Sequence, residues 1–240
     1  MKVETVVSER YAQGAQCREE SLCCPVDYDA ALLEKLPAEI LERDYGCGDP
    51  SRYVRSGDVV VDLGSGGGKI CYMAAQITGC CGRVHGIDMT GEMLDLAERY
   101  RLVIAETLGY DNVQFHRGLI QDVADIMPPA AADLVISNCV LNLVSEADRR
   151  RMIQGIYTVL KPGGRIAIAD IVCDQRVPEE LKQDPALWSG CISGAFQKDD
   201  FLAAFTEAGF ANVRYDVWED EAWREVAGLR FHSATVCAEK

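Results

Sequence analysis

The sequence predicts an α/β domain with a mostly parallel sheet. From about Arg55 onward, short apolar runs alternate with helical patterns of the length that crossover connections need. A glycine-rich turn also joins the first apolar run directly to a helical pattern. The expected strands are residues 59–63, 84–88, 113–117, 134–138, 166–171, 213–217 and 231–238, and the expected helices are 69–78, 91–108, 146–160 and 198–208.

Individual residues mark where these helices begin and end. Thr90 precedes the pattern at 91–108, and its hydroxyl is expected to accept a hydrogen bond from an orphan amide of the first turn. The pattern at 146–160 runs into Lys161-Pro162-Gly163-Gly164, in which proline cannot continue a helix and glycine permits a sharp turn. The next strand is therefore expected to start directly after this stop.

The first 54 residues show a different pattern. Residues 11–29 are polar and contain cysteines without sustained periodicity, and a helical segment follows at 30–44 with apolar residues on one face. This part is too short for a second domain. We interpret residues 1–54 as an N-terminal lid on a main domain formed by residues 55–240.

Composition and charge narrow the class of protein. The 240 residues are 48% hydrophobic and have a formal net charge of −14, so the overall field repels polyphosphate and nucleic acid is a poor candidate partner. No stretch reaches the roughly 18 consecutive apolar residues of a membrane helix, and the N-terminus lacks the basic and apolar order of a secretory signal. We expect a cytoplasmic protein without membrane association.

A cofactor site is predicted at the glycine-rich turn. The strand 59–63 ends in Asp62-Leu63 and leads into Gly64-Ser65-Gly66-Gly67-Gly68-Lys69 and a helix, which is typical of nucleotide-type cofactor sites. Asp88 closes the next strand, where a carboxylate can accept both ribose hydroxyls, and Asp122 follows the third strand. The sequence therefore predicts a ligand with a ribose.

Two residues distinguish between cofactors. Lys69 occupies the third glycine position of the dinucleotide fingerprint, which disfavours NAD. Asp62 would repel a pyrophosphate but suits a ligand with an ammonium group. S-adenosylmethionine has an ammonium group and also a carboxylate for the helix N-terminus.

Together with Leu160-Lys161-Pro162-Gly163-Gly164, these features resemble the class I S-adenosylmethionine-dependent methyltransferases. The resemblance covers roughly residues 55–240 and implies a Rossmann-like sheet with strand order 3-2-1-4-5-7-6. It also implies that the cofactor lies against Tyr45, Asp62, Gly64, Ser65, Gly66, Lys69, Asp88, Met89, Ile120, Gln121, Asp122 and Asn138.

The position of each cysteine on the expected sheet separates structural thiols from candidate ligands. Ligands of open α/β sheets lie beyond the carboxyl ends of the strands. Cys80 and Cys81 lie at the opposite end, Cys71 is expected to pack in the first turn of a helix, and Cys237 is expected in the core. The chain contains 11 cysteines in all, and its length does not require a disulfide framework.

Three other cysteines are expected to converge at the mouth of the cofactor site. Cys139 follows the fourth strand, Cys191 lies in the connection after the fifth, and Cys47 belongs to the lid. Thiolates select soft metals and metalloids, and trivalent arsenic binds three sulfurs. Zinc remains an alternative, but no C-x-x-C pair supports it, and His85, His116 and His232 are scattered on strands.

The motifs around these cysteines resemble the arsenite methyltransferases over nearly the whole chain. The matching segments are Tyr45-Gly46-Cys47-Gly48, Asp62-Leu63-Gly64-Ser65-Gly66, Gly86-Ile87-Asp88-Met89-Thr90, Ile136-Ser137-Asn138-Cys139-Val140-Leu141-Asn142-Leu143, Gly190-Cys191-Ile192-Ser193-Gly194-Ala195, Pro178-Glu179-Glu180-Leu181 and Ser233-Ala234-Thr235. The resemblance implies that Cys139 and Cys191 hold arsenic, and that Cys47 is a third ligand or a redox partner.

The family also has a cysteine further upstream. Cys17, Cys23 and Cys24 all compete for that role here, and Cys24 is slightly favoured. The sequence ends at the last expected strand, whereas many relatives have a further C-terminal domain, so repeated methylation or product handling is expected to differ.

We therefore expect an enzyme that transfers a methyl group from S-adenosylmethionine to trivalent arsenic, with catalysis mostly by positioning. A thiol or thioredoxin-type reductant would return the arsenic product to its trivalent state, as the resemblance also implies. One alternative is a methyltransferase of an ordinary metabolite, with Tyr45 and Asn138 as pocket groups. Another is a non-catalytic thiol sensor or metalloid-binding protein with the same fold.

Overall fold

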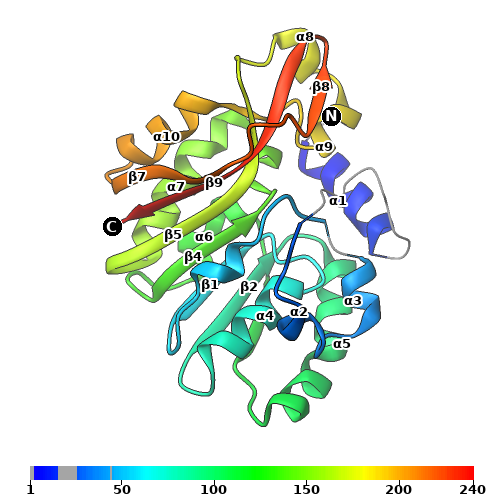
Figure 1. Ribbon diagram of the computed structural model, residues 1–240, viewed down its shortest axis with the longest axis vertical. Helices are drawn as coiled ribbons and strands as arrows, with labels where there is room; N and C mark the ends of the chain where they lie inside the picture. Colours follow the sequence, from blue (N-terminus) through cyan, green and yellow to red (C-terminus); the bar gives the residue numbers. More distant parts are fainter. Residues whose placement is uncertain (1–2, 16–25, 44) are drawn as a thin grey trace.

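The computed structural model describes residues 3–15, 26–43 and 45–240, and shows a central sheet covered by helices on both faces (Figure 1). Within these described residues, nine strands form the sheet, and seven of them follow one another in the order β3-β2-β1-β4-β5-β9-β7. The first five of the long strands pair in parallel, whereas β9 is antiparallel to both β5 and β7. With β7 and β9 counted as the sixth and seventh expected strands, this is the expected order 3-2-1-4-5-7-6.

The seven expected strands and four expected helices are all present. The strands are β1 (Val59–Leu63), β2 (Arg83–Asp88), β3 (Val113–Arg117), β4 (Ala132–Asn138), β5 (Leu160–Cys173), β7 (Ala211–Trp218) and β9 (Leu229–Glu239). The helices are α4 (Lys69–Thr78), α5 (Gly91–Leu108), α7 (Glu146–Val159) and α10 (Lys198–Glu207). Short additional elements are β6 (Phe196–Gln197), β8 (Arg224–Val226), α6 (Val123–Ile126), α8 (Glu179–Lys182) and α9 (Pro185–Ser189).

Alternating side chains of the buried strands feed two separate apolar cores. Val60 and Val84 pack with α4 and α5 on one face, whereas Val61 and Ile87 pack with α6, α7 and α10 on the other. This alternation is the consequence of the two-residue period of a strand, and it explains the continuous apolar runs in the sequence. Because helices cover both faces of the sheet, a ligand site can form at the carboxyl ends of the parallel strands.

A third cluster lies at this end of the sheet and includes two of the candidate ligands. Cys47 and Cys191 pack there with Val7, Ile171 and Phe231, all of them buried. The N-terminal helix α1 (Val3–Gly14) lies beside α9 at this end (Figure 1). The sheet therefore places segments from both termini around the same point.

Two expectations about local structure in the main domain were wrong. The segment 161–164 belongs to β5, because the amide of Gly163 bonds to the carbonyl of Lys240 and the amide of Lys240 bonds to the carbonyl of Gly164. Thr90 is at the N-cap position of α5, but its hydroxyl accepts no capping hydrogen bond. The backbone amide of Thr90 instead donates to the carboxylate of Asp88, and both residues line the pocket described below.

The N-terminal segment also differs from its expected form. The helix expected at 30–44 is divided into α2 (Ala30–Leu33) and α3 (Ala38–Glu42), because Pro37 lacks the amide that a continuous helix would need. Helix α1 was not expected from the sequence. Within the described residues, no helix is long and apolar enough to span a membrane.

Candidate functional site

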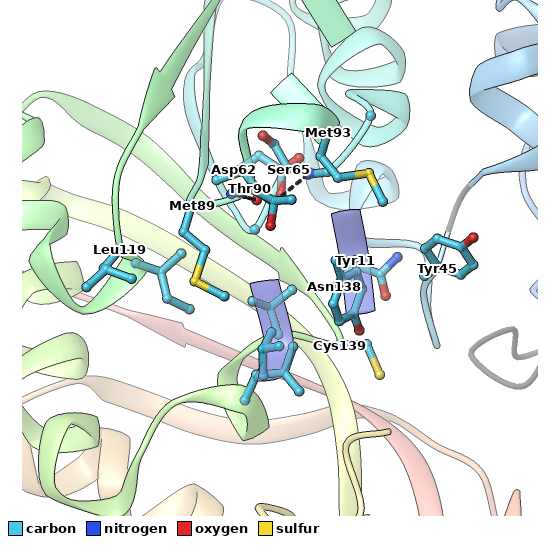
Figure 2. Close-up of a pocket in the computed structure, with 18 of the residues that line it drawn as sticks. Tyr11, Tyr45, Asp62, Ser65, Met89, Thr90, Met93, Leu119, Asn138 and Cys139 are labelled. Atoms are coloured by element: carbon cyan, nitrogen blue, oxygen red, sulfur yellow. Dashed lines mark hydrogen bonds between the residues drawn. The ribbon is translucent and has the colours of Figure 1, made fainter. Parts of the chain in front are cut away.

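A pocket opens where β1, β2 and β4 end, and Figure 2 shows its principal side chains. The residues that line it come from the glycine turn, the ends of β2 and β4, and helix α1. Ten of the twelve expected cofactor residues line this pocket: Tyr45, Asp62, Gly64, Ser65, Gly66, Asp88, Met89, Ile120, Gln121 and Asn138. Cys139 also lines it and lies next to Asn138 and Tyr11.

The glycine turn is held against the end of β2. The amides of Gly64 and Ser65 both donate to the carbonyl of Ile87, at 2.8 and 3.1 Å. Gly64 has φ of +74°, and a Cβ there would lie 2.4 Å from the side chain of Val140. Glycine is therefore required both by the backbone conformation and by close packing at this position.

Asp88 links the turn to helix α5. Its Oδ2 accepts from the amide of Gly66 at 2.9 Å, and its Oδ1 accepts from the amide of Thr90 at 2.8 Å. Burial raises the pKa of Asp88, and these hydrogen bonds oppose that shift. The carboxylate is thus fixed at the edge of the pocket with both oxygens oriented by backbone amides.

The polar groups of the pocket fit S-adenosylmethionine. The Oγ of Ser65 is buried without a hydrogen-bond partner in this structure, and it belongs to the turn where the methionine end of the cofactor would lie. Asp62 is only 2% exposed and lines the same space, where its carboxylate suits an ammonium group. A buried polar atom without a partner is costly, so a ligand that reaches Ser65 would remove that cost.

Two expected cofactor residues do not line the pocket. The Nζ of Lys69 lies 3.2 Å from the centre of the Tyr28 ring, a cation–π contact that joins α4 to the N-terminal segment. Asp122 forms an ion pair with Arg151 at 2.5 Å. Contact of either residue with the cofactor remains a prediction.

Asn138 connects the end of β4 to the loop that contains Cys47. Its Oδ1 accepts from the amides of Cys47 and Gly48 at 2.9 and 3.1 Å, and its Nδ2 donates to the carbonyl of Gly48 at 2.8 Å. A Cβ on Gly46 would lie 2.3 Å from the Nδ2 of Asn138. Glycine at this position therefore lets the loop approach the sheet closely enough to be held there.

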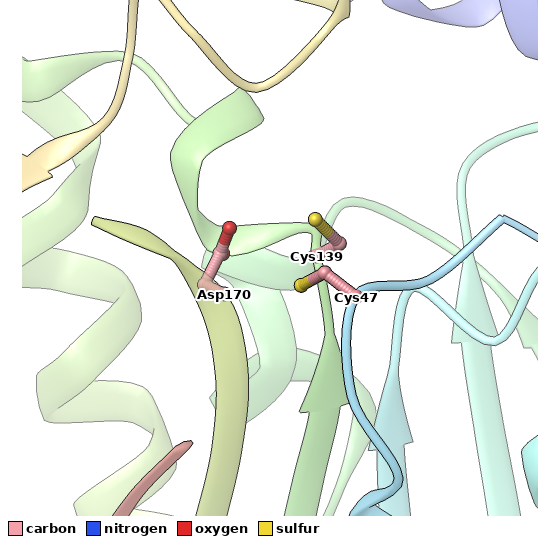
Figure 3. Close-up of side chains that lie close together, drawn as sticks. All are labelled: Cys47, Cys139 and Asp170. Atoms are coloured by element: carbon pink, nitrogen blue, oxygen red, sulfur yellow. The ribbon is translucent and has the colours of Figure 1, made fainter. Parts of the chain in front are cut away.

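The loop brings Cys47 beside Cys139, as Figure 3 shows. The Sγ atoms of Cys47 and Cys139 and a carboxylate oxygen of Asp170 all lie within 4.8 Å of one another. Cys191 is not part of this group, but its Sγ donates to the Cys139 carbonyl at 3.2 Å. Cys139 therefore joins the other two cysteines: its Sγ lies close to that of Cys47, its carbonyl is bonded by Cys191, and it lines the pocket.

Two of these cysteines have strained backbones. Cys139 has φ of +63° and Cys191 has φ of +61°, and they are two of only five non-glycine residues with positive φ in the described part of the chain. This conformation costs of order 1 to 3 kcal/mol for each residue, and such strain concentrates at functional sites. The surrounding structure therefore holds both thiols in place at a cost in stability.

Two of the three thiols, Cys139 and Cys191, have a raised pKa, which favours their protonated forms. The hydrogen bond with Cys191 lowers the pKa of Cys139, but the hydrogen bond with Cys47, burial and the charge of Asp170 together hold it well above its ordinary value. The hydrogen bond with Cys139 and burial likewise raise the pKa of Cys191. Because neutral thiols are far less costly to bury than thiolates, the group is stable without a ligand.

Sequence reasoning missed Asp170, which faces the thiols from β5. Its Oδ1 accepts from the amide of Ile171 at 2.8 Å and from Nδ2 of Asn142 at 2.7 Å. The residue is fully buried, which raises its pKa to about 7. The signal in the sequence was a single acidic residue inside the apolar run 166–172. Burying a charged group is costly unless it has partners, so an acidic residue in a buried strand indicates a polar site.

Sequence reasoning also missed Tyr11 of helix α1. Tyr11 lines the pocket, and burial and the neighbouring Cys191 and Cys139 raise the pKa of its hydroxyl well above the ordinary value. Arg10 fixes the helix through hydrogen bonds to Ser189 and Ala186 just before Cys191. Helix α1 therefore covers the junction between the pocket and the thiols.

The cysteines and histidines that the sequence did not favour as ligands lie elsewhere in the described structure. Cys71 donates to Asp62 at 3.2 Å and is fully buried, and Cys237 is buried in the apolar core that also includes residues of α4. Cys80 and Cys81 are exposed in the turn between α4 and β2, at the end of the sheet opposite the pocket. His85 and His116 stack on each other, with Nδ1 and Nε2 separated by 3.0 Å. Cys17, Cys23 and Cys24 lie outside the described residues.

Comparisons with known proteins agree with this geometry. Residues 54–209 match a family of methyltransferase domains. The arsenite methyltransferase of Aquipseudomonas alcaligenes is 34% identical over 234 residues, which are 93% of this chain and 67% of that protein. The human arsenite methyltransferase is 33% identical, over 85% of this chain and 56% of its own length.

A solved structure shows the same arrangement of elements. The crystal structure of an arsenic(III) S-adenosylmethionine methyltransferase from Chlamydomonas reinhardtii is 33% identical, with a TM-score of 0.82 over 90% of this chain and 75% of that chain. The present chain spans only about half the length of several relatives, including 50% of the arsenite methyltransferase of Halobacterium salinarum.

Proposed function

The chain belongs to the arsenite methyltransferase family of class I S-adenosylmethionine-dependent methyltransferases, and we propose that it methylates trivalent arsenic held by Cys47, Cys139 and Cys191. The observation that supports this most is the position of Cys139. It lines the cofactor pocket, its Sγ lies within 4.8 Å of the Cys47 Sγ, and its carbonyl accepts from the Cys191 thiol. An arsenic atom bound there would face the pocket directly.

Arsenic binding can proceed by exchange of hydroxide for thiol. Each protonated thiol forms an As–S bond as an As–O bond breaks, and its proton leaves with the hydroxide as water. Arsenic stays trivalent and the buried site gains no charge. The sulfurs of Cys47 and Cys139 lie within 4.8 Å of each other, and they would have to approach one another until two bonds of about 2.3 Å, the length of a zinc–thiolate bond, meet at one pyramidal centre.

When bound, S-adenosylmethionine supplies a methyl group on a positively charged sulfur, and its transfer leaves that positive charge on the arsenic. Asp170 lies on the arsenic side of the site. Asn142 and the amide of Ile171 hold its carboxylate facing the thiols. We assign Asp170 the role of stabilising the charge that develops there, since fixed charges act strongly in a buried site.

Helix α1 and the loop at Cys47 would exclude water from the reacting groups. After transfer, the arsenic needs two electrons to become trivalent again, and two cysteine thiols can supply them by forming a disulfide. We propose Cys47 as one partner and Cys24, Cys23 or Cys17 as the other, with an external thiol or thioredoxin-type reductant to reopen the bond.

Replacing Asp88 with alanine is expected to weaken S-adenosylmethionine binding by about 1.5 to 3 kcal/mol, the scale of a hydrogen bond to a charged group. The loss arises because the carboxylate would hold the ribose and also fixes Gly66. Calorimetry measures the affinity, and Asp95→Ala on the exposed face of α5 is the matched control. Equal affinities for the two variants would remove Asp88 from the cofactor site.

Replacing Cys47 with serine is expected to affect two arsenic substrates differently. Cys139 and Cys191 would still bind arsenic, but through two sulfurs, which is sufficient for a methylated arsenical and insufficient for inorganic arsenite. Initial rates with both substrates should show the larger loss on arsenite. Cys173→Ser, at another buried thiol of the same apolar cluster, should leave both rates nearly unchanged. Equal losses in Cys47→Ser would make Cys47 a structural residue of the lid.

The proposed substrate can be tested by fluorescence of Trp188, which precedes Cys191 closely and donates to the carbonyl of Leu143. Titration with arsenite should quench or shift this emission, and S-adenosylmethionine should alter the response. Binding without turnover would instead indicate a thiol sensor. An absence of binding would favour a methyltransferase of another metabolite.

A further inference from the structure

A second pair of thiols lies far from the proposed site, in the turn between α4 and β2. Cys80 and Cys81 are adjacent in the chain between Gly79 and Gly82, and both are exposed. Their Sγ atoms are 3.9 Å apart. The two sulfurs therefore lie on the same side of the turn, although they belong to consecutive residues.

The backbone of this turn is fixed from several directions. The amide of Gly82 donates to the carbonyl of Gly79 at 3.2 Å, and this closes the turn around the two cysteines. The same carbonyl accepts from Nδ2 of the buried Asn112 at 2.9 Å. A Cβ on Gly82 would lie 2.4 Å from the side chain of Thr78, so the chain is tightly packed below the thiols. The backbone therefore holds the two cysteines in place before any ligand binds.

From this geometry we propose that Cys80 and Cys81 form a second binding site, which chelates a trivalent arsenical with one organic group and two exchangeable ligands. Two bonds of about 2.3 Å, the length of a zinc–thiolate bond, reach across the observed 3.9 Å to one centre, and a small rotation of the two side chains is enough to close the chelate. Soft metalloids prefer sulfur ligands, and a fixed pair binds more tightly than two flexible thiols because less entropy is lost.

The ligand exchange balances without an oxidant or reductant. Two As–O bonds break and two As–S bonds form, and the two thiol protons leave with the hydroxides as two water molecules. Arsenic remains trivalent and keeps its organic substituent. A species with only one exchangeable ligand would form a single As–S bond and lose the advantage of the chelate. The site therefore favours monosubstituted over disubstituted arsenicals.

This assignment depends on the thiol pair alone and not on the proposed methyl transfer. The turn lies at the opposite end of the sheet from Cys139, so the two sites bind their ligands separately. Because both side chains point into solvent, serine substitutions there are expected to leave the fold and the methylation activity unchanged.

The test is the stoichiometry of phenylarsine oxide, whose hydrate has one phenyl group and two exchangeable hydroxyls. The wild type, Cys80→Ser, Cys81→Ser and the double variant are incubated with the probe and exchanged into a buffer containing a monothiol, which strips singly bonded arsenic. Native mass spectrometry then counts the phenylarsenic groups retained. Cys237→Ser, at a buried thiol, is the matched control.

The wild type and Cys237→Ser should retain one phenylarsenic group more than the double variant, and each single variant should also lose that group. Retention of the wild-type number by the double variant would overturn the site. Retention of the phenylarsenic group by either single variant would overturn the proposal that both thiols bind the same arsenic. Loss of methylation with full retention of phenylarsenic would concern only the proposed function.

Discussion

Serine in place of Cys139 or of Cys191 is expected to reduce methylation by at least about 100-fold while the affinity for S-adenosylmethionine stays near that of the wild type. Serine is a hard, protonated ligand that trivalent arsenic does not prefer to sulfur. Loss of positioning of the reacting atoms alone accounts for a factor of this size. Rates and calorimetric affinities of the purified variants measure the two effects separately.

The substitution is well suited to this test because it changes one atom. Serine keeps the Cβ, so the left-handed backbone at residues 139 and 191 is under the same strain as in the wild type. Cys237→Ser replaces another buried thiol and should remain nearly fully active. Full activity in Cys139→Ser or Cys191→Ser would reject the thiol site.

Asp170→Asn is expected to lower kcat by about 100- to 1,000-fold, the range found when one preorganised electrostatic group is removed from an active site. Binding of arsenite and of S-adenosylmethionine should change little, because the side chain keeps its shape and its oxygen can still accept from Asn142 Nδ2 and from the amide of Ile171, although the 3.2 Å bond from the amide of Asn142 is lost. Asp174→Asn, at a carboxyl group four residues further along the chain, is the control and should retain activity.

The pH profile separates a charge effect from a structural one. Burial raises the pKa of Asp170 to about 7, so the ionised carboxyl is lost as the pH falls through this value. The wild-type rate should therefore decrease as the pH falls below about 7, and this decrease should be absent in Asp170→Asn. An unchanged kcat, or the same acidic limb in both proteins, would show that Asp170 does not act through its charge.

Removing the charge is not expected to unfold the protein. The folded pKa of Asp170 lies above the unfolded value of about 3.9, so its ionisation lowers stability as the pH rises from the lower value to the higher. Above pH 7 the wild type already has this cost in full. Asparagine is uncharged at all pH values, so thermal unfolding at pH 8 should show a folded variant.

Local sequence patterns were sufficient to predict the sheet. Each of the seven expected strands is present, and the turn at Gly64 identified the end of the sheet where ligands bind. Strands buried on both faces, such as β1 and β4, have continuous apolar sequences and few alternatives, so their positions were predictable, whereas the start of β5 was not. The position of Cys139 followed from its place directly after β4.

Residues whose environment depends on distant contacts were harder to predict. Helix α1 has a mostly polar sequence and is held by contacts such as Arg10 with Ser189, which no local pattern reveals. Asn138 was expected to bind cofactor, and its amide also holds the loop at Cys47. Asp170 faces the thiols only because β4, β5 and the loop meet there.

The most direct test of the central proposal is incubation of the purified protein with arsenite, a thiol and S-adenosylmethionine, followed by chromatographic speciation of the arsenic. The account predicts methylated arsenicals in the wild type, formed together with S-adenosylhomocysteine in equal amounts per methyl group, and none in Cys139→Ser. Arsenic that stays inorganic in the wild type, although both arsenite and S-adenosylmethionine bind, would contradict it.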